Sequence, residues 1–284
     1  MTRIAFIGFG EAAQAFTRSL RDNFITDFSA FDINETTPMR VAADALNVVL
    51  APAAQAAVEG ADWVISAVTA GQSLVAAQSV TVSAGQVFID INSVSPQRKI
   101  ATSAHVKAQG ADYVDMAVMT PVHPRGHRSP VLVAGDYAGM EARLRELDFV
   151  FEIAGQNPGD ATAIKMVRSL FVKGLEALTT QTLLAAQSAG CLDQITKSLG
   201  TSYPGLNWPD FPRYQMERVA THGKRRAEEM RESATTMADL GHAPGKAMAE
   251  AIADLQALIG GLGLKLDTDE PLETLVSQVS RALK

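Results

Sequence analysis

Short apolar runs alternate with stretches of helical periodicity through the first half of the chain. Several runs contain consecutive apolar residues rather than strict alternation, which is expected where helices cover both faces of a sheet. Repeated strand-helix-strand units of this kind predict a doubly wound, parallel α/β sheet. The predicted strands are Arg3 to Ile7, Phe28 to Asp32, Trp63 to Val68, Val87 to Ile91, Tyr113 to Val118 and Val131 to Ala134.

The second half of the chain has a different pattern. A turn-rich stretch, Gly155 to Gly159, separates one more strand-like run from the remainder of the chain. Beyond it the apolar residues recur at helical spacing. The predicted helices are Ala161 to Ser188, a stretch near Gln215 to Leu240, Lys246 to Ile259, and Glu273 to Leu283. We therefore expect two domains, a sheet domain over residues 1–158 and an all-helical domain over residues 159–284.

Charge and cysteine content narrow the class of protein. The formal net charge of -6 and pI of about 5.4 argue against a general affinity for nucleic acid, which requires a basic excess. Cys191 is the single cysteine, so an internal disulfide is excluded and a reducing compartment is favoured. We see neither a signal-peptide core nor a membrane-spanning stretch. These features predict a cytoplasmic protein without nucleic-acid or membrane partners.

A glycine-rich turn follows the first predicted strand. Residues Gly8 to Ala13 spell G-x-G-x-x-A between a strand and a run compatible with a helix. In that context Gly8 permits the tight turn, Gly10 allows close approach of a pyrophosphate, and Ala13 lets helix and strand pack. The helix N-terminus then directs N–H groups toward the phosphates. The alternative is a purely structural strand-to-helix turn.

Asp32 ends the second predicted strand, where a carboxylate can accept hydrogen bonds from the adenosine ribose. A negative charge there repels a 2′-phosphate, and no arginine follows directly, so NAD is favoured over NADP. The alternative is an unrelated surface aspartate. The expected coenzyme contacts are Gly8, Phe9, Gly10, Glu11, Ala12, Asp32, Ala67, Val68 and Thr69.

Three further segments extend the pattern. Asp90 to Pro96 ends a strand in small hydroxyl residues before a proline-led helix, and Ser93 and Ser95 there can cradle a carboxylate or serve only as a helix N-cap. Asp115 to Pro121 comes next, and then Gly159 to Ser169. In this order the segments resemble the β-hydroxyacid dehydrogenase and 6-phosphogluconate dehydrogenase superfamily. The resemblance implies that Lys165 is the catalytic lysine and that substrate contacts come from Asn92, Ser93, Ser95, Met119, Thr120, Ser169 and Lys173.

The sequence departs from this family at two places. Thr120 and Pro121 replace a glycine pair at the expected substrate pocket, and Arg168 and Ser169 replace an asparagine pair after the lysine. The first departure resembles a less characterised branch and also the imine reductases, which vary there. Ser169 can still supply a hydrogen bond one turn after Lys165.

The predicted helix Ala161 to Ser188 is amphipathic. Its apolar side gathers Ala163, Val167, Leu170, Phe171, Gly174 and Leu178. Its polar side carries Lys165, Ser169, Lys173 and Glu176, and is either a solvated face or the wall of a substrate cleft. In a cleft, Lys165 can act as the general base that removes a hydroxyl proton during hydride transfer. Glu176 is expected to pair locally with Lys173 or with the neighbours of Lys165.

The favoured function is NAD-dependent oxidation of a β-hydroxy acid, a small acidic substrate. An imine or ketone reductase is one alternative, and a non-catalytic NAD-binding protein is another. No metal ligand set is expected. The basic loop His123 to Arg128 either steers the acidic substrate or is an ordinary solvated connector. Relatives pair their helical domains, so we expect a homodimer formed through this half of the chain.

Overall fold

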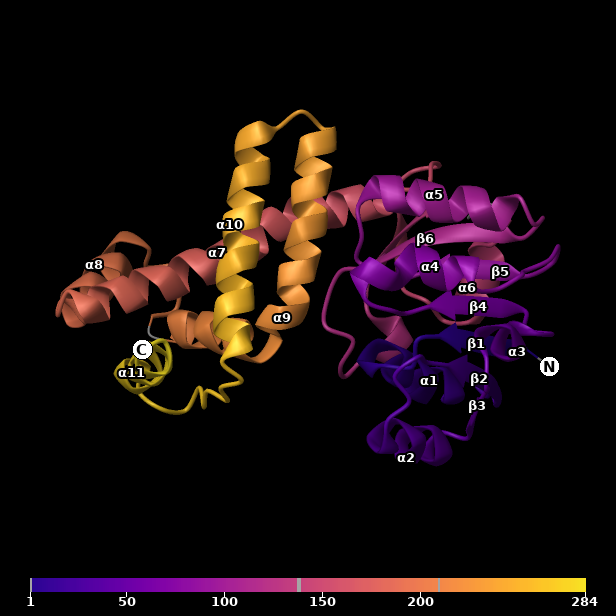
Figure 1. The fold of residues 1–284 in the computed structure, drawn as a ribbon, viewed down its shortest axis with the longest axis horizontal. Helices are drawn as coiled ribbons and strands as arrows, with labels where there is room; N and C mark the ends of the chain where they lie inside the picture. The colour runs from indigo at the N-terminus through magenta and orange to yellow at the C-terminus, as the bar shows by residue number, and fades with distance from the viewer. Residues whose placement is uncertain (1, 137–138, 209) are drawn as a thin grey trace. The chain divides into compact units, whose positions relative to one another are not determined.

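The computed structural model describes residues 2–136, 139–208 and 210–284. The chain forms two compact units that divide within one long helix, between Met166 and Val167. This division lies further along the chain than the boundary expected at residues 158 and 159. The first unit contains a sheet covered by helices and the second is helical, as predicted (Figure 1).

The sheet of the first unit has the strand order β3-β2-β1-β4-β5-β6-β7-β8. Its strands are β1 (Arg3–Ile7), β2 (Asp27–Phe31), β3 (Val48–Leu50), β4 (Trp63–Ser66), β5 (Val87–Asp90), β6 (Asp112–Val118), β7 (Val131–Gly135) and β8 (Phe151–Ile153). The sheet is mostly parallel, as predicted, and β7 is the exception because it runs antiparallel to β6. The residues between these strands hold only a short 3-10 helix, whereas a parallel return requires a longer crossover.

Helices cover the two faces of the sheet separately (Figure 1). Alternate residues of β1 supply the two apolar layers: Ile4 and Phe6 enter one, and Ala5 and Ile7 enter the other. The first layer is closed by α1 (Glu11–Arg21), α2 (Thr37–Ala45) and α6 (Glu141–Glu146). The second is closed by α3 (Ala54–Val58), α4 (Ser73–Gln78) and α5 (Pro96–Lys107).

The change of face occurs between β1 and β4, which are neighbours in the sheet. In open α/β sheets, ligands bind beyond the carboxyl ends of the strands at such a switch point. The strand order around it is the one found in dinucleotide-binding folds. The predicted glycine turn follows β1 at this position.

The loop between β6 and β7 packs on α1, so its description as an ordinary solvated connector is wrong at Gly126 and His127. His127 is fully buried, and its Nδ1 lies 2.7 Å from the Ser19 hydroxyl of α1. A Cβ on Gly126 would lie 2.0 Å from the same hydroxyl oxygen, so only glycine fits. The His127 ring also contacts Phe149 edge-on.

The second unit consists of helices packed around two apolar clusters. The helices are α7 (Asp160–Ser188), α8 (Leu192–Ser202), α9 (Asp210–Asp239), α10 (Ala243–Gly261) and α11 (Leu272–Ala282). Four of these match predicted helices, and α8 was not predicted. The first residues of α7 belong to the first unit. Helices α9 and α10 lie side by side (Figure 1). Within the described ranges, no helix is both long enough and apolar enough to cross a membrane.

Candidate coenzyme and substrate site

The glycine turn connects β1 to α1 in a conformation that needs glycine. Gly8 has a φ of +87°, and a Cβ there would lie 2.4 Å from the carbonyl oxygen of Ala67. Around Gly10, by contrast, no atom of the described residues lies within 4 Å of the Cβ position. Gly10 is also the N-cap of α1, so the open backbone faces the N-terminus of that helix. This turn fits a pyrophosphate group.

Asp32, directly after β2, forms a hydrogen bond to the same turn. One carboxylate oxygen accepts a hydrogen bond from the Phe9 amide at 2.9 Å, and the other accepts one from the Asn34 amide at 2.8 Å. The Phe9 side chain is buried in the core, so its expected coenzyme contact is restricted to its backbone. Glu11 is exposed in the first turn of α1, and Ala12 packs partly against the core.

The loop after β4 is joined to the turn on one side and to β5 on the other. The Ala67 amide donates to the Ile7 carbonyl at 2.8 Å, and the Val68 amide donates to Asn92 Oδ1 at 2.7 Å. Asn92 is buried, and its side-chain nitrogen donates to Asp90 and to the Ser66 hydroxyl. Thr69 is exposed at the end of this loop. Expected coenzyme and substrate contacts therefore lie beside one another at the carboxyl ends of β4 and β5.

The segment after β5 leads into α5. Ser95 is the N-cap residue of α5 and Pro96 is its first residue, as the sequence pattern indicated. The Ser95 side chain makes no capping hydrogen bond to the described first turn, although its backbone carbonyl accepts bonds from the amides of Arg98 and Lys99. Ser95 is buried and Ser93 is partly exposed.

Helix α7 starts against this segment. The amides of Gly159 and Thr162 donate to one oxygen of Asp115, at 3.0 and 3.2 Å. The Thr162 hydroxyl donates to the Val94 carbonyl at 2.6 Å. Lys165 lies in the second turn of α7 and is half-buried. The helix that carries the lysine therefore begins beside the Asn92 to Pro96 segment.

A fully buried charge cluster lies behind these contacts. The Lys99 ammonium group is 3.0 Å from a carboxylate oxygen of Asp90 and 3.2 Å from one of Asp115, and all three side chains are inaccessible to solvent. The Tyr113 hydroxyl donates to the other Asp90 oxygen at 3.1 Å. Burial raises the pKa of the Tyr113 phenol well above its usual value, and the charges of Asp90 and Asp115 add to that increase.

Met119 and Thr120 lie at the end of β6. Met119 packs partly against the small cluster that contains Ala161, a residue in the first turn of α7, while Thr120 is exposed. Both residues are therefore on the same edge of the sheet as the start of α7.

Ser169 and Lys173, two expected substrate contacts, are buried within the helical unit. Lys173 pairs with Glu229 of α9 at 2.9 Å and donates to the Ser169 hydroxyl at 3.1 Å. Glu176 pairs with Arg226 of α9 and accepts a bond from Gln256 of α10, so the expected pairing of Glu176 with Lys173 is wrong.

The apolar side of α7 is exposed at Val167, Phe171 and Leu178. Their exposed fractions are 49%, 69% and 66%. The polar side is the buried one in this unit, because α9 and α10 supply partners of opposite charge and hydrogen-bonding capacity. Ser169, Lys173 and Glu176 of the polar stripe are therefore buried and do not form a solvated face.

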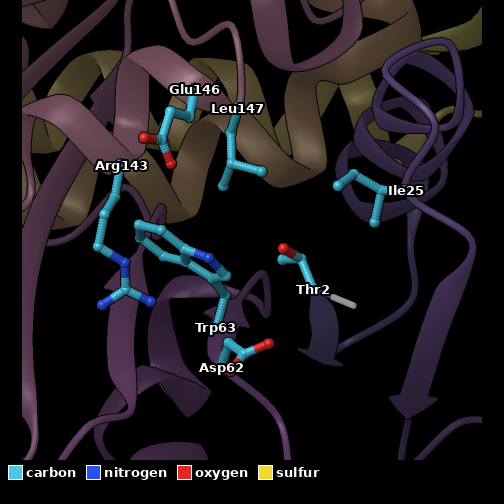
Figure 2. Close-up of a pocket in the computed structure, with 7 residues that line it drawn as sticks. All are labelled: Thr2, Ile25, Asp62, Trp63, Arg143, Glu146 and Leu147. Carbon is cyan, nitrogen blue, oxygen red and sulfur yellow. The ribbon is translucent and has the colours of Figure 1, made fainter.

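A separate surface depression lies at the opposite edge of the sheet. Thr2, Asp62 and Trp63 line it at the amino ends of β1 and β4, and Figure 2 shows Arg143 beside the Trp63 ring. The Arg143 guanidinium carbon is 4.5 Å from the ring centroid. Because the glycine turn is at the carboxyl ends of the strands, this depression is not the coenzyme site.

Sequence reasoning missed Lys99. Asp90 and Asp115 each sit in a strand with apolar neighbours, and two carboxylates buried in adjacent strands require a cation. That requirement is the signal that points to a buried lysine or arginine nearby.

Comparison with known proteins agrees with this geometry. Residues 3–157 match the NAD-binding domain of 6-phosphogluconate dehydrogenase, and residues 186–259 match a domain family of unknown function, DUF1932. A conserved hypothetical protein from Sinorhizobium meliloti 1021 has a structure with a TM-score of 0.74 and 34% identity, covering 100% of this chain and 97% of that one.

Two further proteins are similar. An uncharacterized 28.5 kDa protein from Methanothermus fervidus is 26% identical over 80% of this chain and 88% of its own length. The 3-hydroxyisobutyrate dehydrogenase of Mycobacterium tuberculosis shares the fold, with a TM-score of 0.74 and 19% identity over 98% of this chain and 99% of that one. The match over residues 3–157 spans more than half of the sequence, and the chain belongs to the family defined by the NAD-binding domain of 6-phosphogluconate dehydrogenase.

Proposed function

We propose that this protein is an NAD-dependent dehydrogenase that oxidises the hydroxyl group of a small β-hydroxy acid, with Lys165 as the general base. The observation that carries the proposal is the arrangement within the first unit. The Gly8–Gly10 turn packs on the loop after β4, and hydrogen bonds join that loop to Asn92 and the Asn92 segment to the start of α7. The proposed pyrophosphate site and the start of α7, the helix that carries Lys165, therefore lie at the same edge of the sheet.

The proposed chemistry is divided among residues of the first unit. The backbone around Gly10 and the N-terminus of α1 bind the pyrophosphate, and Asp32 accepts hydrogen bonds from the adenosine ribose. NAD, when bound, accepts the hydride. The amino group of Lys165 takes the proton from the substrate hydroxyl, and Ser93 and Ser95 hydrogen-bond the substrate carboxylate. Asp32 also favours NAD, since its charge repels a 2′-phosphate.

A screen of hydroxy acids, from small aliphatic to aryl-bearing, tests this proposal by NADH absorbance. With an active substrate, we expect Lys165→Ala to lower kcat by about 10²- to 10⁴-fold, the usual contribution of a positioned general base. The Kd for NADH should stay within about twofold because the lysine is not part of the glycine turn. Imine reduction that survives Lys165→Ala would instead identify a reductase.

A non-catalytic NAD-binding protein is the second candidate. The observation that favours it is that Lys173 and Ser169, two expected substrate contacts, are engaged with Glu229 and with each other inside the helical unit. Tight NADH binding without turnover of any acid, alcohol or imine would support this candidate.

We also propose that the protein is a homodimer through the helical half. The support is the exposed apolar face of α7, where Val167, Phe171 and Leu178 recur at helical spacing. A second copy of the chain offers the same face, and such a self-complementary contact closes as a two-fold dimer.

A further inference from the structure

Lys99 is a fully buried charged residue of the coenzyme-binding unit, and the proposed chemistry does not use it. Its side chain has no solvent exposure, and its ammonium group donates to the Asp90 carbonyl at 2.6 Å. It faces carboxylate oxygens of both Asp90 and Asp115, which are paired across β5 and β6. A buried ion cluster of this kind contributes little net stability compared with an apolar replacement, so stability alone does not account for it.

The two carboxylates connect the cluster to different segments of the first unit. Asp115 accepts the amides of Gly159 and Thr162 and so fixes the first turn of α7. Asp90 accepts the amide and the side-chain nitrogen of Asn92 at 2.9 and 2.8 Å. Asn92 in turn accepts a hydrogen bond from the Val68 amide. One ammonium group thus connects the coenzyme loop to the helix that carries Lys165.

We propose that Lys99 and Asp115 are positioning residues: their buried ion pair sets the start of α7, and thereby the place of the Lys165 amino group relative to the Asn92 and Val68 loops. This inference rests on the proposed function of Lys165. Lys99 and Asp115 do not touch substrate. They act by fixing the helix from which the general base extends, over less than two turns of rigid α-helix.

The test compares the unmodified chain with three variants. Asp115→Ala removes the acceptor of both α7 amides, and Lys99→Met leaves two buried carboxylates without a cation. The double variant Lys99→Met/Asp115→Asn removes the cation together with one negative charge and keeps a side-chain oxygen for the amides. Asp136→Ala is the matched control, because Asp136, directly after β7, forms a partly exposed ion pair with Lys107 of α5 and accepts the Tyr113 amide, and is not a member of the buried ion cluster.

We expect each single variant to lower kcat by about tenfold to a hundredfold, as displacement of a catalytic group by about 1 Å does. The substrate KM and the NADH Kd should change by no more than about twofold, and the double variant should recover most of kcat. The control should match the unmodified protein. Single variants that are folded at the assay temperature and keep full kcat would overturn the proposal.

A second measurement separates this proposal from the dehydrogenase assignment. Acetic anhydride labels only unprotonated amines, so mass spectrometry of the Lys165 peptide against pH reports the surroundings of that amine without any turnover. We expect the labelling profile to shift in Asp115→Ala and to be unchanged in Asp136→Ala. If no substrate is found, the proposed function fails but the labelling still decides the role of Asp115; an unchanged profile in Asp115→Ala rejects it.

Discussion

Asp32 has a structural role in the glycine turn, and we propose that the same side chain also selects the coenzyme. Its carboxylate accepts the Phe9 and Asn34 amides, which shapes the glycine turn, and its charge opposes a phosphate at the same place. Asp32→Asn keeps one accepting oxygen and removes the charge. We expect the preference for NADH over NADPH to fall by about tenfold, because a hydrogen bond to a charged group contributes about 1.5–3 kcal/mol. Fluorescence titration with both coenzymes measures this change.

The comparison variant for Asp32 is Glu35→Gln. Glu35 is on the same loop and pairs with Arg40 on the surface. This substitution should leave the coenzyme preference unchanged. An equal preference for the two coenzymes in the unmodified protein would contradict the role assigned to Asp32.

His127 makes stability depend on pH. Burial lowers its pKa from 6.5 to about 4, and the charge of Arg128 adds to the decrease. In the unfolded chain His127 binds its proton below about pH 6.5. Its contribution to stability is therefore complete above pH 6.5 and declines as the pH falls toward 4. We expect a loss of up to about 3 kcal/mol in the free energy of unfolding over this range, measured by urea denaturation.

His127→Gln should remove most of this pH dependence, since glutamine does not titrate. His242→Gln is the control because His242 is exposed, and it should keep the slope of the unmodified protein. A His127→Gln variant with an unaltered slope between pH 6.5 and 4 would show that another group is responsible.

At the level of elements, sequence patterns predicted most strands, the helical half and the glycine turn, because these depend on local periodicity and backbone requirements. The burial of the polar side of α7 against other helices was not predicted, for a physical reason. A polar stripe is buried only when other helices supply partners, and here Glu229 and Arg226 lie far along the chain from Lys173 and Glu176. Helical periodicity carries no information about such distant partners. Lys99 was missed for the same reason.

The contact between α9 and α10 depends on glycine. A Cβ on Gly223 would lie 2.2 Å from the Gln256 carbonyl oxygen, and one on Gly260 would lie 2.6 Å from the Lys224 amide. Gly223→Ala must therefore separate the two helices. We expect it to lower the free energy of unfolding by about 1–3 kcal/mol, the usual cost of overpacking. Thermal and urea unfolding measure this change.

Gly261→Ala provides the matched control on α10. No described atom lies within 4 Å of its Cβ position, and alanine is the better helix former. This variant should be as stable as the unmodified protein or slightly more stable. If both alanine variants proved equally stable, the close packing of α9 on α10 would not be a requirement of the fold.

For the whole molecule, the decisive question is what covers the apolar face of α7. Phe171 is 69% exposed in the single chain, and Val167 and Leu178 on the same face are exposed as well. A contiguous apolar face of this kind is unusual on a soluble monomer.

If a second copy covers it, Phe171→Asp places a charge in the interface without a partner. We expect sedimentation velocity to show a dimer for the unmodified protein and a monomer for Phe171→Asp. Phe24→Asp is the control, because Phe24 is 92% exposed but lies outside α7, and it should remain dimeric. A monomeric unmodified protein, or a dimer that persists in Phe171→Asp, would exclude this face as the contact between copies.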